Sequence, residues 1–133
     1  MSAREMLESY GEGLRALDTL ERELAVCRRR AKEDGDGVER NAARAETLSR
    51  EAATLRRRLY RRRREAEAWL ERLPNGSERR VLALRYLNLL SYDEISEICY
   101  FSQRHVFRLH RRAVLRLQSL MEEEARKAAP SLP

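Results

Sequence analysis

The most distinctive chemistry in the sequence lies between residues 102 and 118, where the chain holds five Arg and no Asp or Glu. The guanidinium of Arg is a planar fork of N–H donors that suits phosphate oxygens and the guanine edge, and a Gln amide suits the adenine edge. On a helix, the first turns can reach base edges while other side chains contact phosphates. The predicted DNA-binding residues are Ser102, Gln103, Arg104, His105, Phe107, Arg108, Arg111 and Arg112, with Gln103, Arg104 and Arg108 on bases and Arg111 and Arg112 on phosphates.

Two capped helices are expected to hold these residues in place. Ser91 stands before an apolar-periodic stretch and Glu94 follows three residues later, which is the capping-box pattern of a helix start. Ser102 is in position to cap the next helix. A helix over 92–99, a short turn and a helix over 103–127 form the layout of a helix-turn-helix that enters the major groove.

The apolar residues of this segment predict a three-helix core. A Pro-Asn-Gly run ends the helix before it, and Ser77 is the N-cap candidate for a helix over 78–89. We expect Ile95 and Ile98 to form the buried face of the short helix. Together these elements predict a domain over 74–127. The buried side of the long helix is predicted to consist of Val106, Leu109, Ala113 and Leu117.

Many positions of this segment match one known domain in register. The matching residues are Leu73, Pro74, Glu78, Arg79, Val81, Leu82, Leu84, Arg85, Tyr86, Leu90, Ser91, Tyr92, Asp93, Glu94, Ile95, Ile98, Ser102, Val106, Arg108, His110, Arg112, Ala113 and Leu117. In this order and spacing they resemble region 4 of sigma-70-type factors. They also resemble small phage and prophage regulators with such a C-terminal domain, including activators of late phage genes.

The resemblance implies a domain that binds promoter DNA through its second helix and, in some members, touches RNA polymerase. It assigns Ser102 to the cap, Gln103, Arg104 and Arg108 to the groove, and Val106 and Ala113 to the core. One position departs from the pattern, because Tyr100 stands where the turn often has Gly. A Tyr with positive φ would be strained, so we expect a turn that is one residue longer or differently shaped.

Residues 1–73 carry a different pattern, with Leu and Ala recurring every three or four positions over 4–31 and again over 38–73. Two Asp-Gly pairs at 34–37 predict a turn between them. Two long amphipathic helices joined by a short turn predict an antiparallel hairpin with coiled-coil-like packing. The predicted fold is all-α, with this hairpin at 1–73, a three-helix helix-turn-helix domain at 74–127 and a frayed tail at 128–133.

An arginine block stands near the end of the second long helix. It places seven Arg in nine positions, and no Asp or Glu interrupts it. One interpretation is pairing across the hairpin with Glu5, Glu8, Glu12 or Asp18. The other is a second basic surface, for phosphates or for an acidic face of RNA polymerase or another protein. The block consists of Arg56, Arg57, Arg58, Arg61, Arg62, Arg63 and Arg64.

The composition limits the classes of function. The chain has 28 Lys and Arg against 22 Asp and Glu, and the resulting charge of +6 favours a polyanionic partner. Cys27 and Cys99 lie far apart without further ligands, so we expect reduced thiols and no metal site. His105 and His110 have no acid or nucleophile at catalytic spacing. We therefore expect neither an enzyme nor a cofactor, and no small-molecule substrate.

The sequence also predicts where the protein works. Its first ten residues are charged where a signal peptide needs an apolar run, and no run of eighteen apolar residues occurs. We expect a cytoplasmic protein with no membrane partner.

The leading hypothesis is a sequence-specific transcription regulator of phage or prophage genes that binds double-stranded DNA, with RNA polymerase as a second candidate partner. One alternative is a phage DNA-packaging subunit of the small-terminase type, because such subunits also join a helix-turn-helix to helical oligomerisation segments. Another is a non-DNA adaptor that binds RNA polymerase through the hairpin. A second apolar stripe on the hairpin, if exposed, would allow a homodimer.

Overall fold

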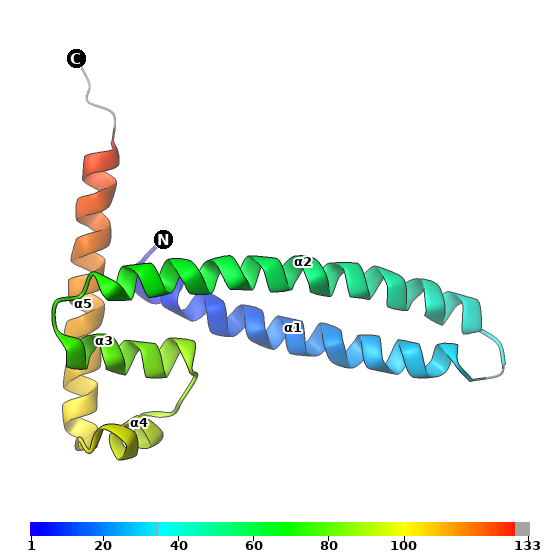
Figure 1. Cartoon of the computed structure of the whole chain (residues 1–133), viewed down its shortest axis with the longest axis horizontal. Helices are drawn as coiled ribbons and strands as arrows, with labels where there is room; N and C mark the ends of the chain where they lie inside the picture. The colour runs from blue at the N-terminus through cyan, green and yellow to red at the C-terminus, as the bar shows by residue number, and fades with distance from the viewer. Residues whose placement is uncertain (34, 130–133) are drawn as a thin grey trace. The chain divides into compact units, whose positions relative to one another are not determined.

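The computed structural model describes residues 1–33 and 35–129, and every regular element in these ranges is a helix (Figure 1). The predicted all-α fold is confirmed. Residue 34 of the predicted turn and residues 130–133 of the predicted tail lie outside the described residues. The helices are α1 (Ala3–Ala31), α2 (Val38–Glu71), α3 (Gly76–Leu82), the π-helical turn η1 (Ala83–Leu87), α4 (Tyr92–Cys99) and α5 (Gln103–Ala128).

Contacts between helices divide the chain into two compact units. One, the hairpin unit, is Glu12–Arg62; the other, the recognition unit, joins Met1–Gly11 to the chain from Arg63 onward. The start of α1 and the end of α2 therefore belong with α3, α4 and α5. The predicted division into 1–73 and 74–127 follows the change of sequence pattern and stays a prediction.

Within the hairpin unit, α1 and α2 run antiparallel (Figure 1). They pack through small and branched apolar residues. The core cluster contains Leu24, Cys27, Ala45 and Leu48, with Leu20 partly buried beside it. A Cβ on Gly13 would lie 2.2 Å from Leu59 Cδ2, so a larger residue at this position would force the Leu59 side chain to move. Arg44 and Glu23 form an ion pair across the helices, with 3.1 Å between Nη2 and Oε1.

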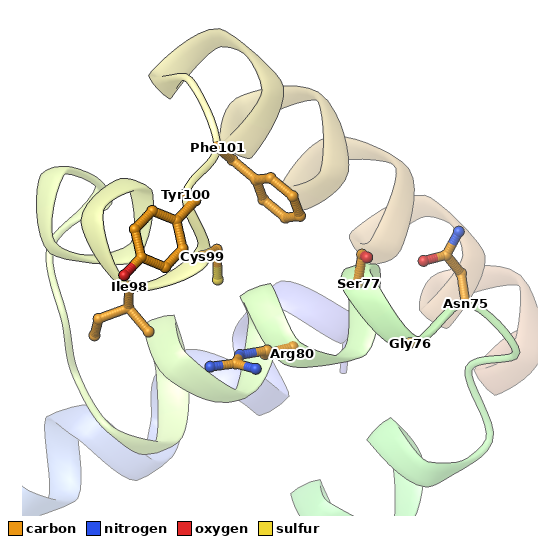
Figure 2. A pocket seen from close by; sticks show the side chains of 8 residues that line it. All are labelled: Asn75, Gly76, Ser77, Arg80, Ile98, Cys99, Tyr100 and Phe101. Atoms are coloured by element: carbon orange, nitrogen blue, oxygen red, sulfur yellow. The ribbon is translucent and has the colours of Figure 1, made fainter.

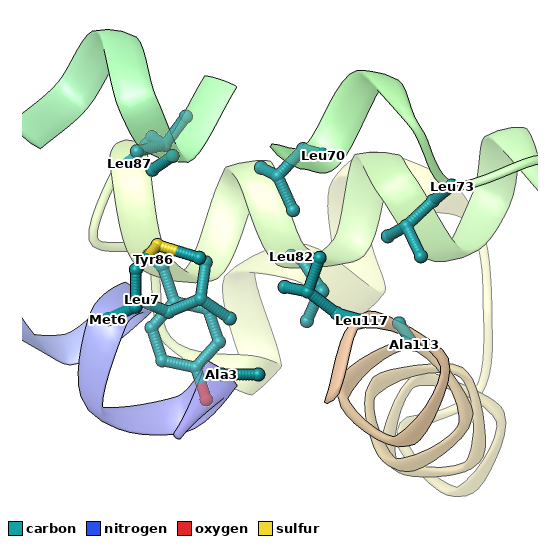
Figure 3. Close-up of a cluster of buried hydrophobic side chains, with 11 residues drawn as sticks. Ala3, Met6, Leu7, Leu70, Leu73, Leu82, Tyr86, Leu87, Ala113 and Leu117 are labelled. Atoms are coloured by element: carbon teal, nitrogen blue, oxygen red, sulfur yellow. The ribbon is translucent and has the colours of Figure 1, made fainter. Parts of the chain in front are cut away.

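The recognition unit is built around a larger apolar cluster (Figure 3). The first turns of α1 and the last turns of α2 cover α3, η1 and the middle of α5. The backbone N–H of Ala3 also donates to Oε1 of Gln118 at 2.7 Å, which fastens the start of α1 to α5. The buried members are Ala3, Met6, Leu7, Ala66, Leu70, Leu73, Leu82, Tyr86, Leu87, Ala113 and Leu117.

A second cluster in the same unit holds the helix-turn-helix together. It consists of Val81, Ile95, Val106 and Leu109, so α3, α4 and α5 share one core. The prediction that Ile98 is buried was wrong, because its side chain is 43% exposed. Helix α4 is short, and its packed face carries the residues at i and i+4, Ile95 and the partly buried Cys99. The chain turns away directly afterwards and leaves Ile98 uncovered.

The start of α3 also differs from the prediction. Asn75, not Ser77, is the N-cap, and its Oδ1 accepts a hydrogen bond from the backbone N–H of Glu78 at 3.0 Å. The helix therefore begins at Gly76, two residues before the predicted start. Asn and Ser are comparable N-cap residues, so composition alone did not decide between these positions.

None of the helices in the described ranges has the length and apolar character needed to cross a bilayer. Both cysteines are free thiols, Cys27 buried and Cys99 half-buried.

Candidate nucleic-acid interface

Helix α4 starts with the capping box that the sequence predicted. Oγ of Ser91 accepts from the backbone N–H of Glu94 at 3.2 Å, and Oε1 of Glu94 accepts from the backbone N–H of Ser91 at 3.0 Å. These hydrogen bonds to Ser91 lower the pKa of the Glu94 carboxyl. The box fixes where the short helix begins and hence where the turn after it lies.

The predicted cap of α5 is also present. Oγ of Ser102 accepts from the backbone N–H of His105 at 3.1 Å, and α5 begins at Gln103. A capped first turn holds its side chains at fixed angles around the helix axis. This matters here because the predicted base-contacting residues stand in the first two turns.

The turn between α4 and α5 keeps a left-handed residue although that residue is not glycine. Tyr100 has φ 56° and ψ 35°, and its backbone N–H donates to the carbonyl of Ser96. The backbone N–H of Phe101 donates to the same carbonyl at 3.2 Å. The expectation of a longer or reshaped turn was therefore wrong. The Tyr100 side chain is 95% exposed and meets no crowding, so the turn bears only the intrinsic cost of the left-handed conformation.

A shallow hollow lies beside this turn, between the start of α3 and the end of α4 (Figure 2). Figure 2 shows Tyr100 and Ile98 at one rim, Arg80 on α3 below them, and Phe101 turned inward. The two exposed apolar side chains next to α5 were not predicted.

Four arginines of α5, named here the recognition arginines, are exposed and form no ion pair with any described residue. The opposite side of the helix is buried, as predicted, at Val106, Leu109, Ala113 and Leu117. Packing therefore fixes the rotation of α5 and presents the arginines to solvent. The recognition arginines are Arg104, Arg108, Arg111 and Arg112.

The fifth arginine of this stretch has an internal role. Arg116 Nε lies 3.4 Å from Oε2 of Glu78, whose side chain is only 1% exposed. This ion pair ties α5 to α3, and the buried carboxylate would be costly without it. The pair was missed because its partners are far apart in sequence. The one available signal was an acid at a position of α3 that the periodicity places inward.

Gln103 is held by a residue that sequence reasoning did not select. Its Nε2 donates to Oδ1 of Asp93, which lies in the first turn of α4. A Gln amide carries two N–H donors and one acceptor oxygen. With one N–H directed to Asp93, the second N–H and Oε1 stay available, which is the pair of groups that an adenine edge requires.

Two other predicted residues pack against aromatic neighbours. Phe107 is 50% exposed, and its ring lies 4.7 Å from that of Tyr92. The guanidinium of Arg85 lies over the other aromatic ring of this pair, with 4.4 Å between Arg85 Cζ and the ring centroid of Tyr92. His105 meets Phe101 edge to face at 4.7 Å. Both residues thus support the surface and keep part of their side chains accessible.

His110 lies on the buried side of α5. Its Nε2 is 2.6 Å from the hydroxyl of Tyr86, and burial is the main cause that lowers its pKa to about 4. Nearby Arg4 and Arg85 lower it further. His110 is therefore neutral and belongs to the core.

Two residues of the arginine block form ion pairs with different partners, one on α1 and one on α2. Arg56 Nη2 lies 2.9 Å from Oε1 of Glu21 on α1. Arg63 pairs with Glu67 at 2.9 Å and donates to the carbonyl of Leu87 at 3.2 Å within the recognition unit. The acids in these pairs are Glu21 and Glu67, neither of which was among the four predicted.

Comparison with known proteins agrees with this geometry. Residues 69–119 match the family model for sigma-70, region 4. The match covers less than half of the chain and spans α3, η1, α4 and most of α5. No curated protein and no solved structure shows a significant match. A sigma-70 region 4 domain, which is a DNA-binding helix-turn-helix, is thus present in the C-terminal half, as the resemblance implied.

Proposed function

We propose that the chain is a sequence-specific DNA-binding transcription regulator that reads the major groove with the start of α5. The observation that carries the proposal is the set of recognition arginines, which are exposed and form no ion pair with a described residue, on a helix whose opposite face is buried in a core. Unpaired cations on a rigid helix favour a polyanion with a fixed pattern of acceptors.

Roles within the helix follow from position. Arg104 and Arg108 are four residues apart and share a face, with about 6 Å between them along the axis. With Gln103 they occupy the first two turns, which are the part of a recognition helix that reaches base edges. Arg111 and Arg112 lie one turn further on and suit phosphates on the groove wall.

Sigma region 4 domains bind both DNA and RNA polymerase, so promoter DNA and the polymerase are the proposed partners. The resemblance to phage and prophage regulators makes such genes the proposed targets. The chain would act by binding, without a catalytic step, cofactor or small-molecule substrate, and it would do so in the cytoplasm where its DNA lies.

Selection of duplexes from a random pool, followed by sequencing, tests the proposal. We expect an enriched motif for the full chain and loss of that motif when Arg104→Ala and Arg108→Ala are combined. Two lost base contacts should weaken binding to the enriched duplex by about 2–6 kcal/mol. Arg126→Ala with Lys127→Ala is the control, since it removes the same charge from the last turn of α5.

An unenriched pool from the unaltered chain would overturn sequence-specific reading. The mass of the protein in solution adds a second check. A monomer or dimer fits regulation, whereas a closed ring of many copies would point to a DNA-packaging subunit instead.

A further inference from the structure

We propose that α2 carries a second, sequence-independent site for the phosphates of duplex DNA, formed by Arg57, Arg58 and Arg61 of the hairpin unit. These three residues are named here the unpaired arginines. The inference rests on the proposed function, because that function brings duplex DNA to the chain. It adds a binding surface on a unit that the sigma-70 region 4 match does not cover.

The structure separates the unpaired arginines from their neighbours in the arginine block. All three are exposed, and none forms an ion pair with a described residue. Arg57 donates one hydrogen bond, to the hydroxyl of Thr54 at 3.3 Å. Arg56, by contrast, is neutralised across the hairpin by Glu21. Among the residues that the structure describes, the internal ion pairs therefore leave Arg57, Arg58 and Arg61 without an ion-pair partner.

The positive charges of the unpaired arginines lie close together on α2 and repel one another. Arg57 and Arg61 are four residues apart, and like charges at this spacing destabilise a helix. Arg58 adds a third charge one turn from Arg61, and no Asp or Glu occurs between Glu51 and Glu65. None of the three contributes to the apolar core of the hairpin. An external anion would relieve this repulsion.

The surface suits phosphates better than an acidic protein. Arg56, Arg57, Tyr60 and Arg61 line a shallow hollow, in which guanidinium groups surround one aromatic ring. Tyr60 is the one large hydrophobic side chain that is exposed among the described residues of the hairpin unit. Protein interfaces are built on a central group of apolar and aromatic side chains, whereas this face offers a single aromatic ring among guanidinium groups. Arg forks bind phosphate oxygens without such a group.

The test measures affinity as a function of salt on the full chain. Fluorescence anisotropy is recorded with a labelled random-sequence duplex between 50 and 200 mM NaCl. The variant combines Arg57→Gln, Arg58→Gln and Arg61→Gln. The control combines Arg22→Gln, Arg44→Gln and Arg50→Gln, which removes the same charge from the same unit at exposed arginines already paired with Asp18, Glu23 and Glu46.

Each lost phosphate contact lowers the salt slope of log K by about 0.9, so the variant should lose about 2.7. The ratio of the affinity of the unaltered chain to that of the variant should then fall about 40-fold when NaCl rises from 50 to 200 mM. The control should keep the slope of the unaltered chain. Circular dichroism verifies that both variants keep their helices.

Two results would overturn the proposal. An unchanged slope in the variant would exclude duplex phosphates as the ligand and favour an acidic protein surface. An equal fall in variant and control would show a general effect of net charge. Neither result concerns the enriched motif, which tests whether α5 reads the base sequence. Failure of this inference can therefore be distinguished from failure of the proposed function.

Discussion

The recognition arginines on α5 and the unpaired arginines on α2 lie on helices that are held in different ways. Helix α5 has a capped first turn and a row of buried residues that packs into two clusters shared with other helices. The hairpin unit joins α2 to α1 through one cluster of four small or branched residues, further buried positions at Ala52 and Leu59, and surface ion pairs. Such exposed pairs contribute little to stability.

This difference matters because arginine can serve in two ways, by reading bases or by attracting phosphates. A side chain can read a base only if its position is fixed to within a fraction of an ångström, and α5 meets that demand through caps and packing. Attraction to phosphates needs charge and tolerates variation in position. We therefore expect sequence preference to depend on α5 and the salt dependence to depend on both helices.

The largest expected effect comes from breaking the core under α5. Ile95→Ala removes a fully buried side chain and should cost about 2–5 kcal/mol of unfolding free energy. Ile98→Ala is the matched control on the same helix, and its exposed side chain should cost less than about 0.5 kcal/mol. Urea unfolding followed by circular dichroism measures both. Equal losses for the two variants would contradict the packing of α4 described above.

A smaller effect is expected from pH. The pKa of His110 is about 4 in the folded chain against 6.5 for a free side chain, so the unfolded chain takes up a proton first as the pH falls. The stabilisation that comes from keeping His110 neutral is present above pH 6.5 and is lost as the pH falls toward 4, with a loss of about 2 kcal/mol by pH 4.5.

His110→Gln supplies the comparison for this prediction, because it keeps a neutral polar side chain near Tyr86. Urea unfolding of both proteins at pH 7 and pH 4.5 gives the difference in their pH dependence. A pH dependence as steep in the variant as in the unaltered chain would assign the effect to other groups.

The smallest effect concerns the turn. Tyr100→Gly should raise the unfolding free energy by up to about 1 kcal/mol, because glycine adopts positive φ without strain and the exposed ring loses no packing. Tyr100→Ala keeps a Cβ and should give no such gain. Thermal unfolding of the three proteins measures the order. A loss of stability in the glycine variant would mean that the Tyr100 ring makes a stabilising contact.

Local features were the predictable part of this molecule. The caps at Ser91 and Ser102 and the buried row of α5 follow from residue type and helical spacing, which depend on neighbours in sequence. Ile98 was misassigned because burial depends on which side of α4 another helix covers. The left-handed conformation of Tyr100 was not expected from its residue type. It is held by hydrogen bonds from the backbone N–H groups of Tyr100 and Phe101 to the carbonyl of Ser96.

The sequence predicted which charged residues form the site, but it did not predict which residues they pair with. The arginines of α5 could be selected from the sequence, but Asp93 beside Gln103 and Glu78 beside Arg116 depend on helices meeting in space. The same holds for the arginine block. Its composition left pairing and anion binding open, and only the structure shows Arg56 with a partner and Arg61 without an ion pair among the described residues.

The most direct test of sequence reading is the ratio of affinities for the enriched duplex and a scrambled duplex, measured at one salt concentration. We predict that Arg104→Ala with Arg108→Ala reduces this ratio close to one, whereas the glutamine variant of the unpaired arginines keeps it. If the ratio survives intact in the Arg104 and Arg108 double variant, α5 is not the reading helix.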